Sequence, residues 1–123
     1  MRRAATVIAG RNLFERVNTL PRVEGNAYFG GQPWDDASLY RARSPVFQAK
    51  GVTTPTLVQH GEADVRVPIS QGYEFYNAVK QQGTPVEMLV LPRQPHGPTE
   101  PRMILKIMQT NLDWFEKHLK PGS

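Results

Sequence analysis

The sequence predicts an α/β fold, in which a parallel β-sheet is covered by helices on both faces. Three short apolar runs have the length and composition of buried strands, at about residues 4–9, 55–60 and 86–91. Three longer segments carry apolar residues at helical spacing, at about residues 11–20, 70–82 and 101–119. Because strands and helices alternate along the chain, the helices can act as the crossovers that parallel strands require. We therefore expect three parallel strands in one domain over residues 1–123.

The first strand, at residues 4–9, lies close to the N-terminus, although a buried parallel strand normally pairs on both sides. The helix that follows is predicted from apolar residues at Leu13, Phe14, Val17 and Leu20. After an irregular segment, Asp35 or Asp36 could cap a short helix that continues through Arg43. Pro45 ends this helix, because the residue before a proline avoids the helical region.

The second half of the chain has clearer boundaries. Pro55 opens the second strand, and Pro68 and Ser70 are suitable residues for the start of the next helix. Gly83 is suited to end that helix in a left-handed conformation, and the third strand follows it. The last helix has the longest apolar pattern, with Ile104, Ile107, Met108, Leu112, Phe115 and Leu119.

Composition excludes several classes of protein. The 123 residues include 39% hydrophobic and 21% charged residues, which is typical of a globular domain. No apolar run is long enough to span a bilayer, and Arg11 follows the first apolar run too soon for a signal peptide. The chain has no cysteine, which excludes disulfides and thiolate chemistry. We expect a soluble, cytoplasmic protein that does not bind membranes.

The charge distribution argues against nucleic acid as a partner. The net charge is +4, but the fifteen Lys and Arg residues are spread along the chain among eleven acidic residues. Nucleic-acid binding requires basic residues that cluster in a patch or stripe. We therefore expect no nucleic-acid partner.

Asp64 and His96 are the candidate catalytic residues. Each lies in a loop directly after a predicted strand, and 96 − 64 = 32 positions separate them. Because the carboxyl ends of parallel strands lie at the same edge of a sheet, the two side chains could meet there. An aspartate that orients a histidine makes two of the three members of a nucleophilic triad.

Each of these two residues also has a simpler interpretation. Asp64 could form an Asx-turn or an ion pair with Arg66, and Glu62 is a rival acid two residues earlier. His96 lies in a loop stiffened by three prolines, which would help to aim an imidazole, but a loop histidine can also be merely solvated. The other two histidines have structural explanations, His60 in the turn after its strand and His118 at a helix end. With no His-x-x-x-His pair, we expect neither a metal site nor a cofactor.

Several motifs occur in a fixed order along the chain. They are His60-Gly61-Glu62-x-Asp64-x-Arg66-Val67-Pro68, then Gly83-x-Pro85-Val86-Glu87, then Pro92-Arg93-x-x-His96-Gly97, and finally Asn111-x-x-Trp114-Phe115-x-x-His118-Leu119. In this order and spacing they resemble the C-terminal end of the prolyl oligopeptidase family of serine peptidases. Upstream, Phe29-Gly30-Gly31-x-Pro33-Trp34 and Arg43-Ser44-Pro45 look like the preceding segment of acylaminoacyl- and dipeptidyl-peptidase-like members. The resemblance extends from about Arg3 to Leu119.

The resemblance implies an α/β-hydrolase fold, of which the three strands would be the last three. It makes Asp64 the triad aspartate and His96 the general base. The family's nucleophile lies in a Gly-x-Ser-x-Gly elbow, and no such motif occurs in these 123 residues. The serines present are Ser38, Ser44, Ser70 and Ser123. The oxyanion-hole segments and the propeller domain of the family are also missing.

The resulting expectation is the C-terminal part of a serine hydrolase domain. It would supply the acid and the base for hydrolysis of a peptide or ester through an acyl-enzyme, and would be inactive alone. The alternative is a non-catalytic module that associates with itself or with a partner. Its basis is the first strand, whose open edge would favour a homo-oligomer that covers it.

Overall fold

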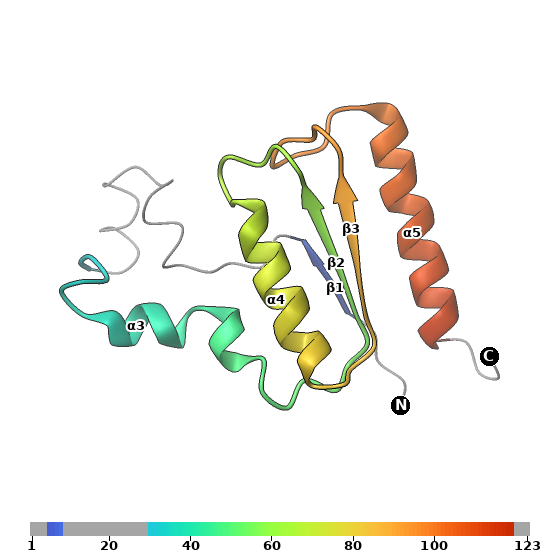
Figure 1. Ribbon diagram of the computed structural model, residues 1–123. Coiled ribbons are helices and arrows are strands. Elements are labelled where there is room, and N and C mark those ends of the chain that lie inside the picture. Colours follow the sequence, from blue (N-terminus) through green and yellow to red (C-terminus); the bar gives the residue numbers. More distant parts are fainter. Residues whose placement is uncertain (1–4, 9–29, 120–123) are drawn as a thin grey trace.

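The three strands form one parallel sheet in the order β1-β2-β3. The structure is a computed structural model that describes residues 5–8 and 30–119 (Figure 1). Its strands are β1 (Ala5–Ile8), β2 (Thr56–Gly61) and β3 (Val86–Leu91). Its helices are α3 (Ala37–Ala42), a short 3-10 helix η1 (Pro45–Gln48), α4 (Ile69–Gln81) and α5 (Pro101–Leu119). The predicted α/β class and all three predicted strands are confirmed.

Strand β2 lies at the centre of the sheet, and all six of its residues are buried. Its apolar residues Leu57 and Val58 are shielded almost completely from solvent. Since successive side chains of a strand point to opposite faces, these two residues anchor the two layers on either side of the sheet. The residue pairing ends with Gly61 of β2 beside Leu91 of β3, so the loops after both strands begin at the same edge.

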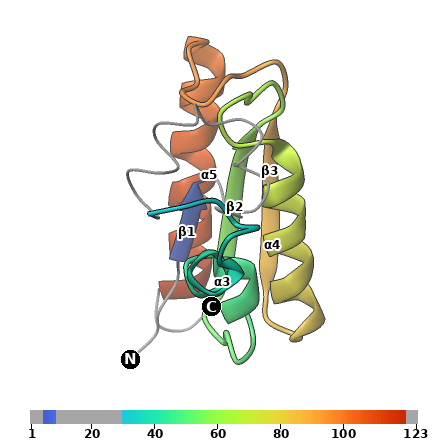
Figure 2. The same cartoon turned by 90° about the vertical axis from the view of Figure 1, so that its left-hand side faces the viewer.

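Helices α4 and α5 cover opposite faces of the sheet, as the two views in Figures 1 and 2 show. On the α4 side, Gly72 packs directly against the ring of His60. On the α5 side, the Nε2 of Gln59 donates a hydrogen bond of 2.6 Å to the Oδ1 of Asn111. Gln59 and His60, neighbours near the end of β2, therefore contact α5 and α4 respectively.

The predicted helix boundaries agree with the structure where it describes them. The predicted helices at 70–82 and 101–119 correspond to α4 and α5, and Gly83 has the left-handed φ of 76° that was expected after α4. Asp36 caps α3, because its side chain accepts a hydrogen bond from the backbone N–H of Ser38. The predicted helix at 11–20 lies outside the described residues.

Helix α5 is less buried than its apolar pattern suggests. Trp114 is its buried residue, whereas Ile104, Leu105, Met108, Leu112 and Leu119 are exposed. A single helix on a narrow sheet is covered only along the stripe that faces the strands, so the neighbouring apolar positions stay open. No helix within residues 30–119 is long and apolar enough to cross a membrane.

Substituting Gly72 with alanine should destabilise the fold, although alanine is the better helix former. An added Cβ would lie 2.6 Å from the Nδ1 of His60 and 3.1 Å from the Cε of Met88. We expect Gly72→Ala to lower the free energy of unfolding by about 1–2 kcal/mol in urea titrations, because overpacking outweighs the gain in propensity. Asn77→Ala, at an exposed position of the same helix, is the control and should be neutral or slightly stabilising. An increase in stability on Gly72→Ala would contradict the close packing of α4 against β2.

Candidate active site

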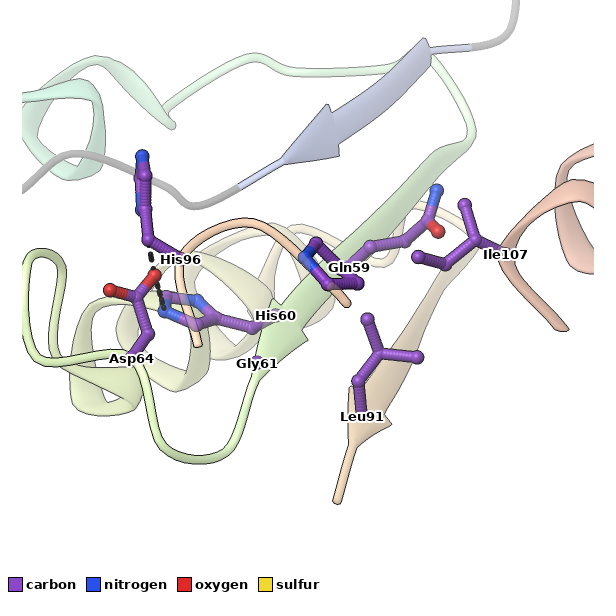
Figure 3. Close-up of a pocket in the computed structure, with 8 residues that line it drawn as sticks. Gln59, His60, Gly61, Asp64, Leu91, His96 and Ile107 are labelled. Carbon is purple, nitrogen blue, oxygen red and sulfur yellow. Dashed lines mark hydrogen bonds and ion pairs between the residues drawn. The ribbon is translucent and has the colours of Figure 1, made fainter. Parts of the chain in front are cut away.

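Asp64 and His96 meet above the carboxyl ends of β2 and β3. The Nδ1 of His96 lies 2.9 Å from the Oδ2 of Asp64, within hydrogen-bond distance (Figure 3). The side chain of Asp64 is 2% exposed and that of His96 is 44% exposed. In a nucleophilic triad the aspartate is likewise buried and hydrogen-bonded to the Nδ1 of a histidine whose other nitrogen is accessible.

The second oxygen of Asp64 is bound by the backbone of its own loop. Its Oδ1 accepts hydrogen bonds of 2.9 Å from the backbone N–H groups of Arg66 and Val67. The Asx-turn that was the alternative interpretation of Asp64 therefore exists, and it coexists with the contact to His96. The turn uses one oxygen and leaves the other for the histidine.

These contacts keep Asp64 ionised. Burial would raise the pKa of the Asp64 carboxyl, but the N–H of Val67, the His96 ring and the N–H of Arg66 together outweigh it and lower the pKa below its ordinary value. A carboxylate can only accept a hydrogen bond, so the Nδ1 of His96 carries the proton that joins them. The Nε2 of a neutral His96 is then free of a proton and able to act as a base.

Two backbone hydrogen bonds tie the Asp64 loop to the His96 loop. The N–H of Glu62 donates to the carbonyl of Leu91 at 2.9 Å, and the N–H of Ala63 donates to the carbonyl of Gln94 at 3.0 Å. The loops can approach this closely because residue 61 is glycine. A Cβ at Gly61 would collide with the carbonyl oxygen of Gln94 and would lie 2.6 Å from that of Pro95.

Glu62, the rival acid, points away from the histidine. Its carboxylate accepts a hydrogen bond of 3.0 Å from the backbone N–H of Arg93, a residue with a left-handed φ of 60°. Glu62 therefore supports the turn that leads into the His96 loop. Asp64, two residues later, reaches the histidine.

His60 is a second histidine beside Asp64. Its side chain is fully buried, and its Nε2 lies 2.7 Å from the carbonyl oxygen of Val67 and 3.6 Å from the Oδ2 of Asp64. A carbonyl only accepts hydrogen bonds, so Nε2 carries the proton of the neutral ring. The sequence placed His60 in this turn, but gave no sign that its ring would lie under the acid.

A small cavity of about 50 Å³ adjoins the pair. Its lining includes Gln59, Gly61, Leu91, His96, Pro98 and Ile107. Ligand pockets usually enclose some hundreds of Å³, so this cavity is too small to hold a peptide. In the described part of the chain, no group of three or more His, Asp or Glu side chains is arranged to hold a metal ion.

The described serines do not complete a triad. Ser38 and Ser70 lie within α3 and α4, and the Oγ of buried Ser44 donates a hydrogen bond of 2.7 Å to the carbonyl of Tyr40. None of the three stands on a turn between a strand and a helix. Ser123 lies outside the described residues.

Comparison with protein families gives one match that covers most of the chain. Residues 14–122 match the model of the prolyl oligopeptidase family. The acylamino-acid-releasing enzyme 1 of Oryza sativa subsp. japonica is 32% identical over 97 residues, which are 78% of this chain and 12% of that protein. The human acylamino-acid-releasing enzyme is 34% identical over 100 residues, which are 79% of this chain and 14% of that protein. The chain thus spans less than one sixth of the length of these relatives.

Solved structures show the same likeness in three dimensions. The acylaminoacyl peptidase of Pyrococcus horikoshii superposes with a TM-score of 0.79 at 26% identity, over 97% of this chain and 20% of that one. An acylaminoacyl peptidase in complex with Z-Gly-Gly-Phe-chloromethyl ketone superposes with a TM-score of 0.82, also at 26% identity, over 97% of this chain and 20% of that one. These peptidases have the α/β-hydrolase fold, so the three-stranded sheet is a part of that fold.

The stability of the chain should depend on pH through Asp64. Because its folded-state pKa is lowered, the ionised group stabilises the fold above the unfolded-state pKa of about 4, and this contribution is lost as the pH falls through the folded-state pKa. In urea titrations between about pH 5 and about pH 2.5, the free energy of unfolding should fall further for the parent chain than for Asp64→Asn. All other acids are shared, so the difference isolates Asp64. Equal losses in the two proteins would show that Asp64 is not held as a carboxylate.

Proposed function

We propose that this chain, which belongs to the prolyl oligopeptidase family, supplies the acid and the base of a serine peptidase as the C-terminal part of an α/β-hydrolase domain. The observation that carries the proposal is the 2.9 Å contact between the Nδ1 of His96 and the Oδ2 of Asp64. The two N–H groups on the other oxygen of Asp64 support it, because they fix the acid in place before any substrate arrives. Such preorganisation is what a triad requires.

The nucleophile of this mechanism is a serine hydroxyl on a segment outside these 123 residues. The Nε2 of His96 takes the hydroxyl proton as the serine oxygen bonds to the scissile carbonyl carbon. The same proton then passes to the leaving amine as the carbon–nitrogen bond breaks, which leaves an acyl-enzyme. Water, deprotonated by His96, attacks the acyl carbon. The bond between that carbon and the serine oxygen then breaks, His96 returns the proton to the serine oxygen, and the acid product is released. Asp64 stays ionised throughout and stabilises the imidazolium.

Peptides are the substrate class that we propose, with esters as the alternative. The support comes from the relatives of the chain, which include acylamino-acid-releasing enzymes and an acylaminoacyl peptidase. The small cavity beside His96 indicates that most of the substrate pocket would be formed by other segments. The chain itself would then contribute chemistry more than specificity.

A chimera tests this proposal directly. The chain would replace the segment of the Pyrococcus horikoshii acylaminoacyl peptidase on which it superposes, and hydrolysis of an acylated peptide would be measured. We expect activity in the chimera, with kcat reduced about 10³-fold or more by His96→Ala or Asp64→Ala, because the members of a triad act as a unit. The matched control is Asp113→Ala, an exposed acid on α5, which should leave kcat unchanged.

A fluorophosphonate probe gives a second measurement on the same proteins. The probe should leave the isolated chain unlabelled. In the chimera it should label the serine nucleophile of the host peptidase, and only when His96 is present. Stoichiometric labelling of any serine in the isolated chain would contradict the assignment. Labelling or hydrolysis that is equally fast in the chimera with His96→Ala would contradict it as well.

Self-association is a second candidate function, and the position of β1 favours it. Strand β1 lies at the edge of the sheet and pairs with β2 alone among the described residues. An open strand edge presents unpaired N–H and C=O groups that can pair with another chain. We propose that a second copy covers this edge when the chain is present by itself.

Proline substitutions at consecutive positions of β1 separate the two edges of the strand. Successive N–H groups point to opposite edges, so of Thr6→Pro and Val7→Pro one should break the pairing with β2 and the other should act only on the outer edge. We expect the second variant to be folded and to sediment as a monomer in analytical ultracentrifugation, whereas the parent chain forms a dimer or larger oligomer. A parent chain that is strictly monomeric at high concentration would contradict this second function.

A further inference from the structure

Gln94 is a buried residue inside the exposed loop that carries His96. It precedes His96 by two positions, and 1% of its surface is exposed. Its Nε2 donates to the carbonyl of Pro92 at 3.2 Å and to the Oε1 of Glu100 at 2.6 Å. Its Oε1 accepts from the backbone N–H groups of Thr99 and Glu100, at 3.1 and 3.2 Å. The amide therefore uses both of its donor hydrogens and both acceptor positions.

These bonds close the chain into a ring that contains His96. Residues 95–97, on the far side of the ring from Gln94, are exposed. Their backbone path is therefore determined mainly by the hydrogen bonds of Gln94 that close the ring. The ring closes just before α5, because Thr99 and Glu100, whose N–H groups bind the Oε1 of Gln94, precede the first helical residue, Pro101. Gln94 thus fixes the turn that leads into α5 as well as the loop.

The backbone of Gln94 extends the same network to the acid. Its carbonyl accepts a hydrogen bond of 3.0 Å from the N–H of Ala63, the residue before Asp64. One residue therefore connects the end of β3, the His96 loop, the start of α5 and the Asp64 loop. His96 can stay within 2.9 Å of Asp64 only while these parts keep their relative positions.

We propose that Gln94 is a positioning residue for the general base, and that Glu100 is the partner that locks its amide in place. The proposal rests on the proposed function of Asp64 and His96. Glutamate could not replace Gln94 alone, because two carboxylates would then face each other across 2.6 Å. The guanidinium of Arg93, 3.2 Å from Glu100, keeps the existing carboxylate paired.

Exchanging the two side chains provides the decisive test. Gln94→Glu should disrupt the lock. The double variant Gln94→Glu with Glu100→Gln should re-form the bond between the two side chains with donor and acceptor reversed, but not the bond to the carbonyl of Pro92, because a carboxylate at position 94 has no hydrogen to donate. Gln94→Ala removes the amide, and Gln109→Ala, an exposed glutamine on α5, is the matched control. Thermal unfolding of each variant shows whether the fold persists, and the exchanged pair gives a folded comparison where a single substitution unfolds the chain.

The first readout is the Nδ1 proton of His96 in the isolated chain at neutral pH. NMR should show it bound to Asp64 and protected from solvent in the parent chain and in Gln109→Ala, and better protected in the exchanged pair than in Gln94→Glu. We expect its exchange with solvent to be at least about tenfold faster in Gln94→Ala and Gln94→Glu, as for any hydrogen bond whose partners lose their alignment. A proton that stays equally protected in both single variants would overturn the proposal, and so would an exchanged pair that folds but protects the proton no better than Gln94→Glu does.

The second readout is catalysis by the chimera carrying the same substitutions. A positioning role predicts that kcat falls about tenfold or more in the single variants with KM little changed, and that kcat is higher in the exchanged pair than in Gln94→Glu. Unchanged kcat in both single variants of a chimera that depends on His96 would overturn the role of Gln94 but leave the proposed function standing. A chimera that hydrolyses substrate equally well without His96 would overturn the proposed function instead.

Discussion

The close approach of two loops at Gly61 is the constraint on which the site depends. Parallel pairing brings Gly61 beside Leu91, and the missing side chain lets the carbonyls of Gln94 and Pro95 cross over the end of β2. This approach allows the hydrogen bond from the N–H of Ala63 to the carbonyl of Gln94. The contact between Asp64 and His96 forms one and two residues further along these loops. Any larger residue at position 61 would separate the loops before their functional groups could meet.

The two oxygens of Asp64 bind different groups, which explains how a residue in a turn can also orient a histidine. The N–H groups on Oδ1 hold the carboxylate in its turn, and Oδ2 remains directed at His96. Burial by itself would favour a neutral acid, and a neutral acid would lose much of its attraction for an imidazolium. The backbone donors therefore keep the group charged as well as in position.

The strands, the two long helices and the meeting of Asp64 with His96 were predictable, because each depends on local periodicity or on the direction of parallel strands. The roles of Glu62 and Gln94 were not, since their partners lie up to 31 positions away and an amide or acid in a loop has no periodic pattern. The exposure of Leu105 and Met108 could not be predicted from the sequence either. An apolar helical pattern indicates that one face of the helix can pack against the sheet. The width of the sheet decides how much of that face is covered.

The order of elements from β2 to β3 has a consequence for how the acid and base come together during folding. Asp64 and His96 are 32 positions apart, and α4 packs against both strands between them. The entropy lost in closing such a loop is modest, and the helix shortens the span that must be closed. The contact between Asp64 and His96 thus forms within one continuous stretch of chain, the β2-α4-β3 unit and the loop that follows it.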